Sequence, residues 1–186
     1  MVIPPMTGRF VRLRCAEEGD VAFTLAIRND PELTKILPKI SNTEQEQRDW
    51  INKQRALEDS CFMVFENLEG KPLGTIGFYH VDSGWESCET GRYVSYGSPA
   101  ENIEAVLLQL DYLFEQRNIK KIVGHVQLEN RHVRIFNERF GYEFVQEVDM
   151  DWGGPSAIYH LYPEKYYARR TKIMALLNAA DQRRSG

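Results

Sequence analysis

The sequence predicts an α+β domain in which helices flank a mostly antiparallel sheet. Segments with alternating apolar and polar residues, typical of half-buried strands, are interspersed with segments whose apolar residues recur at helical spacing. Half of the connections between consecutive strand segments are turns or loops without a helix, which favours antiparallel pairing. The predicted order is strand, two helices, three strands, helix, strand, helix, two strands and a helical tail over about 164–186. Residues 1–186 are expected to form a single domain.

The elements of the first half each have a local signal. Alternation over 8–15 predicts a strand, and Asp20 is an expected N-cap for a helix over 21–28. Thr43, followed three residues later by Glu46, predicts a capping box that opens the second helix. The remaining strands of this half are expected at 61–66, 73–81 and 89–97.

The stretch over 93–141 carries the densest set of signals. A strand ends at the turn Gly97-Ser98-Pro99, and a long helix with one apolar face follows. Alternation then predicts a strand over 120–128, and Asn130 opens another helix. A strand that enters a helix through a tight turn presents free N–H groups and the positive end of the helix dipole, so an anion site is predicted at this turn. The last two strands are expected at 143–151 and 156–162.

Composition narrows the class of protein. Hydrophobic residues make up 42% and charged residues 27% of the chain, and the net charge of −4 argues against nucleic acid and anionic membranes as main partners. Cys15, Cys61 and Cys88 are widely spaced without a C-x-x-C pair, so we expect no zinc site, no disulfide framework and a reducing compartment. No apolar run approaches the ~20 residues of a membrane span, and the first residues lack signal-peptide features. A cytoplasmic protein is expected.

Three motifs follow one another in a fixed order. Glu89-Thr90-Gly91-Arg92-Tyr93 resembles an E-I-G-Y strand, and Glu104-Ala105 followed by Leu110-Asp111-Tyr112-Leu113-Phe114 resembles a helix of the form E-A…L-D-Y-A-F. Asn130, followed by Phe140-Gly141-Tyr142, resembles N…x-G-F. Taken together, these motifs resemble the GNAT family of acyl-CoA-dependent N-acetyltransferases, particularly the branch with ribosomal-protein N-terminal and amino-sugar acetyltransferases. The resemblance covers about residues 8–161.

The resemblance implies the GNAT fold, an acyl-CoA N-acyltransferase fold with splayed central strands, and acetyl-CoA as cosubstrate without a metal. The turn from Gly97 to Asn102 would offer N–H donors to the pyrophosphate. The pantetheine arm would pair with the exposed strand edge through backbone groups of Val94 and Tyr96. The residues expected to bind the cofactor are Val94, Tyr96, Gly97, Ser98, Ala100, Glu101, Asn102, Asn130, Phe136 and Arg139.

Two sites depart from the family's pattern. Ala100 and Asn102 stand where the phosphate loop usually has glycine and a glycine or alanine, residues that let the backbone approach a phosphate. Asn137 stands where many members carry the tyrosine that protonates the leaving thiolate. Tyr96, a water or the solvent would then supply this proton, and a thiol pKa of ~8.5 makes the thiolate a tolerable leaving group.

The implied reaction is direct attack of a primary amine on the acetyl thioester. The amine must first lose a proton, so a general base is useful. Glu89 is the first candidate, because the family often uses a carboxylate near this strand. His80 is the second candidate, and His125 is a comparable one, because histidine titrates near neutrality. Tyr96 is the candidate acid.

Several alternatives stay open at this point. The altered loop and the missing tyrosine also fit a catalytically silent GNAT-fold module that binds CoA or a protein partner. The acceptor is an amino sugar or nucleotide-linked amino sugar, a protein N-terminus, or a small amine or amino acid. The loop over 36–42 with Trp85 and Trp152 is expected to form the substrate mouth, and Trp50 to be a packing anchor. The run Arg169–Lys172 is expected to be a solvated helix face, with homodimerisation through the tail helix as the minor option.

Overall fold

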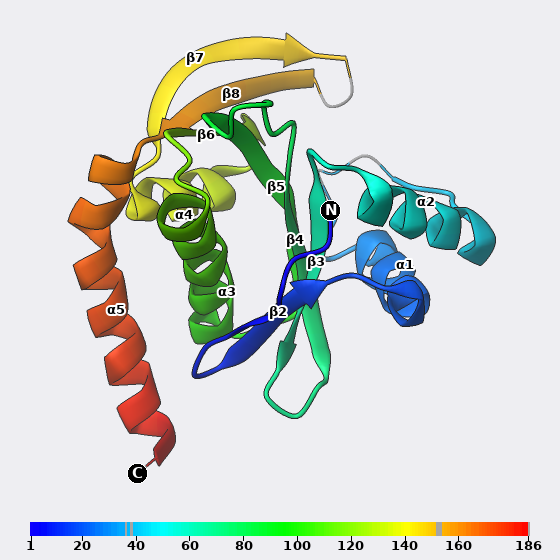
Figure 1. The fold of residues 1–186 in the computed structure, drawn as a ribbon, viewed down its shortest axis with the longest axis horizontal. Coiled ribbons are helices and arrows are strands. Elements are labelled where there is room, and N and C mark those ends of the chain that lie inside the picture. The colour runs from blue at the N-terminus through cyan, green and yellow to red at the C-terminus, as the bar shows by residue number, and fades with distance from the viewer. Residues whose placement is uncertain (36, 38, 152–153, 186) are drawn as a thin grey trace.

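A mixed sheet runs through the molecule in the computed structural model, which describes residues 1–35, 37, 39–151 and 154–185 (Figure 1). Its strands lie in the order β1-β2-β3-β4-β5-β6-β8-β7. The strands are Met6–Thr7 (β1), Val11–Cys15 (β2), Cys61–Asn67 (β3), Pro72–Tyr79 (β4), Ser87–Ser95 (β5), Lys121–Gln127 (β6), Glu143–Met150 (β7) and Gly154–Leu161 (β8).

Helices cover both faces of this sheet (Figure 1). One face carries α1 (Val21–Asn29), which follows the short turn η1 (Glu18–Asp20), and α2 (Glu44–Ala56). The other face carries α3 (Pro99–Asp111) with its extension η2 (Tyr112–Gln116), α4 (Arg131–Phe140) and α5 (Pro163–Ser185). In the described part of the chain, no helix is long and apolar enough to cross a membrane.

The two central strands splay apart. All other strand pairs are antiparallel, whereas β5 and β6 are parallel and pair only from Ser87 to Thr90 of β5. Beyond Thr90, β5 stays paired with β4 as far as Ser95. A register shift between Thr75 and Gly77 of β4 places an extra residue in β5, a bulge that bends this strand. The predicted sheet, mostly antiparallel with splayed central strands, is confirmed.

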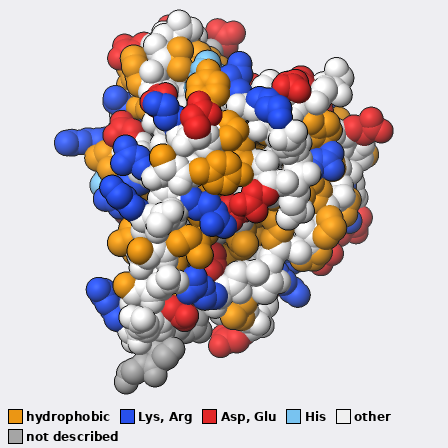
Figure 2. Space-filling model, turned by 60° about the vertical axis from the view of Figure 1, so that its left-hand side comes forward, with side chains coloured by type: hydrophobic (Ala, Val, Ile, Leu, Met, Phe, Trp, Pro, Cys, Tyr) orange, Lys and Arg blue, Asp and Glu red, His pale blue; other side chains and the backbone are white. Residues whose placement is uncertain are grey.

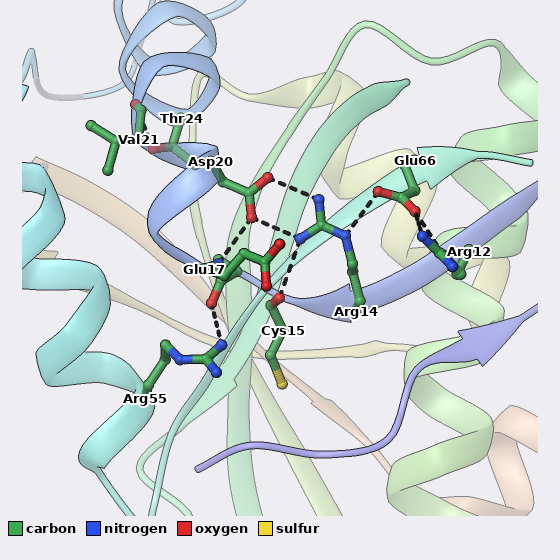
Figure 3. A network of polar contacts seen from close by, with 10 residues as sticks. Arg12, Arg14, Cys15, Glu17, Asp20, Val21, Thr24, Arg55 and Glu66 are labelled. Atoms are coloured by element: carbon green, nitrogen blue, oxygen red, sulfur yellow. Dashed lines mark hydrogen bonds and ion pairs between the residues drawn. The ribbon is translucent and has the colours of Figure 1, made fainter. Parts of the chain in front are cut away.

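A network of buried charges ties the start of α1 to β2 and β3 (Figure 3). Asp20 occupies the predicted N-cap position, but its carboxylate does not cap the helix. It accepts two hydrogen bonds from Arg14, at 2.7 and 2.9 Å, and one from the Glu17 N–H. Arg14 also donates to Glu66, which is 2% exposed and bonded to Arg12 as well. The network therefore fixes the helix that stands over one side of the sheet.

The tail helix packs on the body of the protein rather than standing free. Tyr166, Ile173 and Leu177 of α5 are buried in the main core. Arg170 forms a two-point ion pair with Asp111 of α3, at 2.7 and 2.8 Å. The expectation that the whole Arg169–Lys172 run is solvated is therefore wrong at Arg170.

Candidate active site

Two hollows flank the point where β5 and β6 part. We call the larger one, of about 460 Å³, the α1/α2 cavity, and the smaller one, of about 280 Å³, the α3/α4 groove. The cavity is lined by Thr24, Arg28, Leu37, Ile40, Asn42, Gln47, Trp50, Phe62, Thr75, Tyr79, Gly91, Arg92, Tyr93, Val94 and His125. The groove is lined by Tyr93, Pro99, Asn102, Ile103, His132, Val133, Phe136 and Arg139. Tyr93 lines both hollows, so the two meet at the splay.

The α3/α4 groove has the shape and chemistry of a site for an extended arm. Ile103, Val133 and Phe136 form apolar walls, and the rings of Phe136 and Tyr93 stack with centroids 6.1 Å apart. Arg139 adds a positive charge to the lining. Of the predicted cofactor-binding residues, Asn102, Phe136 and Arg139 line this groove.

The residues whose backbone groups face the open edge of β5 differ by one position from those expected. The Tyr96 N–H donates to the Leu73 carbonyl of β4 at 2.8 Å, so it is not available to a cofactor. Alternation along the strand directs the backbone groups of Val94 to β4 as well, opposite Thr75. The expected pairing through Val94 and Tyr96 is therefore wrong, and the backbone of Ser95 faces the unpaired edge instead.

The predicted phosphate loop is closed by its own side chains. The Ser98 N–H donates to the Glu101 carboxylate at 2.7 Å and the Glu101 N–H donates to Ser98 Oγ at 3.4 Å, which together form a capping box. The Gly97 N–H donates to Ser95 Oγ at 2.7 Å, and Asn102 Nδ2 donates to the Gly97 carbonyl at 3.0 Å. The N–H groups of Gly97 and Ser98, which were expected to bind a pyrophosphate, thus donate to protein groups. The Glu101 carboxylate lies at the helix end where an anion would bind.

Asn130 and Tyr96 also have structural partners. The Asn130 side chain caps α4 by accepting from the Val133 N–H at 3.2 Å. The Tyr96 hydroxyl donates to the Asp30 carboxylate at 2.8 Å, half of the side chain is exposed, and the residue lines neither hollow. The assignment of Tyr96 as the catalytic acid is therefore corrected, because its hydroxyl lies outside both hollows.

Glu89 and the two candidate histidines come together from three neighbouring strands. The Glu89 carboxylate of β5 forms a hydrogen bond with Nδ1 of His80, the residue after β4, at 2.8 Å. Its other oxygen lies 3.2 Å from Nδ1 of His125 in β6. A carboxylate beside Nδ1 favours the neutral imidazole that carries its proton on Nδ1, which leaves Nε2 as the acceptor. His125 lines the α1/α2 cavity and its side chain is 16% exposed, whereas that of His80 is 68% exposed. His125 is thus the histidine that faces the cavity.

The mouth of the cavity is only partly the one expected. Trp50 packs edge-on against Phe62, as a packing anchor would, and also lines the cavity. Trp85 lies outside the cavity, with the Arg117 guanidinium 3.5 Å from its ring. Trp152, Ile36 and Pro38 lie outside the described residues.

Sequence reasoning missed Tyr93 and Arg92. Both belong to the Glu89–Tyr93 motif, which identified the strand without giving these two side chains a role. The signal that could have found them is the interruption of regular alternation along this strand. Such an interruption accompanies a bulge, which redirects a side chain.

Comparison with known proteins agrees with this architecture. The crystal structure of a GCN5-related N-acetyltransferase from Brucella melitensis has a TM-score of 0.79 and 19% identity, and covers 94% of this chain and 85% of that one. The apo structure of FdhC, a nucleotide-linked sugar GNAT, has a TM-score of 0.75 and 21% identity, with coverages of 90% and 98%.

The spermidine N-acetyltransferase from Vibrio cholerae, in complex with CoA and spermine, has a TM-score of 0.74 and 18% identity, with coverages of 86% and 99%. At these identities the likeness supports the fold alone. A search of the curated proteins gave no match. The family model described as an acetyltransferase (GNAT) domain matches residues 11–143. The chain therefore belongs to the GNAT acetyltransferase family.

Proposed function

We propose that this protein is an N-acetyltransferase that transfers an acetyl group from acetyl-CoA to a primary amine. The observation that carries the proposal is that Tyr93 lines both hollows. A transferase of this kind must bring two substrates to one point from separate sites. The α3/α4 groove would hold the cofactor and the α1/α2 cavity the amine, on the two faces of the sheet.

The groove fits the pantetheine arm of acetyl-CoA. Acetyl-CoA, when bound, supplies an acetyl group activated as a thioester. Ile103, Val133 and Phe136 would pack on the arm, and Arg139 would meet a phosphate. The loop at the start of α3 fits the pyrophosphate only after the Glu101 carboxylate has left the Ser98 N–H. Breaking this contact costs about 1 kcal/mol.

In the proposed mechanism, His125 is the general base that removes the proton from the incoming ammonium group. A neutral His125 accepts it at Nε2, and the Glu89 carboxylate, 3.2 Å from Nδ1, stabilises the imidazolium that forms. The deprotonated nitrogen is then a nucleophile. In this assignment Glu89 is the positioning residue rather than the base itself.

An acetyl-transfer assay with a panel of amines tests the proposal. The free thiol of the released CoA is the quantity measured. His125→Gln is expected to lower kcat about 100-fold, since a general base typically contributes 10²–10⁴-fold. It is also expected to remove the acidic limb of the pH–rate profile, where the base becomes protonated. Glu89→Gln should lower kcat less and shift that limb. His160→Gln, on the neighbouring strand β8, is the matched control and should keep wild-type kcat. An unchanged acidic limb in His125→Gln would refute the assignment.

The closed loop favours one second candidate function, a catalytically silent module. A pyrophosphate site that is occupied by its own carboxylate is what a relative that no longer uses the cofactor would show. This alternative predicts that no amine in the panel is acetylated.

A further inference from the structure

Two arginines give the α1/α2 cavity a positive lining. Arg28 and Arg92 line it together with His125, and none of the described residues that line it is Asp or Glu. The chain as a whole carries a net charge of −4, and acidic and basic side chains are interspersed on the face drawn in Figure 2. The charge of the cavity is therefore opposite in sign to that of the protein.

Arg92 has guanidinium N–H donors without an acceptor among the described residues. Its Nη1 donates to Gln54 Oε1 at 2.8 Å and to Ser60 Oγ at 3.2 Å, both neutral groups. Its other guanidinium nitrogens, Nε and Nη2, have no protein acceptor among the residues that the structure describes, and no carboxylate there lies within ion-pair distance of it. Burial lowers the pKa of Arg92, and the field of Asp59 only partly offsets this. A half-buried guanidinium in this state can hold a carboxylate or phosphate at two points.

The fold fixes Arg92 beside the meeting point of the two hollows. Its backbone has a φ of +57°, a left-handed conformation that is uncommon outside glycine, and its carbonyl accepts from Thr75 Oγ1 at 2.8 Å. The guanidinium lies over two rings, 5.3 Å from the centroid of Trp50 and 4.6 Å from that of Tyr79. Tyr93, which lines both hollows, is the next residue. An anion held by Arg92 would thus anchor a molecule next to the passage through the sheet.

We propose that the acceptor amine carries an anionic group, a carboxylate or a phosphate, on the same small molecule, and that Arg92 binds this group. The inference rests on the proposed function, because it names the class of amine that the cavity takes. A cavity of about 460 Å³ suits a small molecule. A polyamine would bring further positive charge to Arg28 and Arg92 without meeting a lining carboxylate, so this chemistry is disfavoured.

Matched acceptors test the inference on the wild-type enzyme. Phenylalanine is compared with phenethylamine, glucosamine 6-phosphate with glucosamine, and spermidine is included as a polycation. In at least one pair, kcat/KM for the member with the carboxylate or phosphate is expected to exceed that of the member without it at least 10-fold. The pair in which this occurs distinguishes a carboxylate from a phosphate. Phenethylamine, glucosamine or spermidine acetylated as well as both acceptors that carry an anionic group would overturn the inference while leaving the proposed function intact.

Variants test the role of Arg92. Arg92→Gln should raise KM at least 10-fold for the acceptor that carries the anionic group, a larger factor than for its partner without that group. Arg28→Gln provides a second test at the same cavity if Arg92→Gln does not fold. Arg48→Gln, on α2 outside the cavity, is the matched control. Equal losses for both members of a pair would contradict the assignment.

Direct binding separates this inference from the proposed function. Calorimetric titration with phenylalanine and with glucosamine 6-phosphate needs no acetyl transfer. If one of them binds the wild type but not Arg92→Gln and no amine is acetylated, the anion site stands and the proposed function fails. If neither binds nor is acetylated, the inference is overturned.

Discussion

Glu104 is a buried carboxylate that organises the N-terminal end of the chain. It is 4% exposed and accepts hydrogen bonds from the backbone N–H groups of Arg9, Phe10 and Val11, at 2.8, 2.6 and 2.9 Å. The turn that wraps around it requires glycine at position 8, because a Cβ there would lie 2.3 Å from Glu104 Cδ. One side chain of α3 thereby fixes the entry to β2.

We expect Glu104→Ala to lower the free energy of unfolding by about 3 kcal/mol, because it leaves three N–H donors, two of them buried, without an acceptor. Urea unfolding followed by circular dichroism measures this change. Glu104→Gln retains one acceptor oxygen and should lose less. Glu115→Ala, further along the same helical segment with a half-exposed side chain, is the control and should stay within about 0.5 kcal/mol of wild type. A loss below 1 kcal/mol for Glu104→Ala would show that water replaces the carboxylate.

Single residues were the hardest part to place from the sequence. Glu104 helped to identify a helix motif, yet its partners lie more than 90 positions away. Glu89 could be named as a candidate because the family often uses a carboxylate near its strand, and His80 and His125 because histidine titrates near neutrality. That Glu89 lies between the two histidines depends on the parallel pairing of β5 with β6, which no local pattern encodes.

At the scale of elements, local sequence signals predicted most of the helices and strands. The capping box of Thr43 and Glu46 is present at α2, and the alternation over 120–128 became β6. Ser98 and Glu101 form a capping box of the related S-x-x-E form, at residues that the sequence predicts as part of a phosphate loop. This motif is compatible with helix capping and with anion binding, and in the structure it caps the helix.

Glu101→Gln is expected to tighten CoA binding about 3- to 10-fold, because it removes a negative charge from the anion site while glutamine can still complete a capping box. Calorimetry at low ionic strength measures the Kd, and added salt should shrink the difference. Glu115→Gln removes the same charge beyond the far end of α3 and should leave the Kd unchanged. A weaker Kd for Glu101→Gln would mean that its carboxylate supports the cofactor.

At the scale of the whole molecule, the splay of β5 from β6 joins the two hollows. The ordered motifs of one stretch predicted this architecture because they belong to elements that are adjacent in sequence. The positive lining of the α1/α2 cavity could not be predicted, since Arg28 comes from α1, Arg92 from the bulge in β5 and His125 from β6. The charge of a cavity is a property of the assembled chain.

The measurement that tests this account most directly is a calorimetric titration with CoA of the wild type and two tryptophan variants. Ile103→Trp fills the α3/α4 groove, whereas Ile135→Trp adds the same ring at an exposed position of α4 outside the groove. We predict micromolar binding for the wild type and Ile135→Trp, and at least 100-fold weaker binding for Ile103→Trp. No binding to the wild type at millimolar CoA, or equal binding to all three proteins, would contradict a cofactor site between α3 and α4.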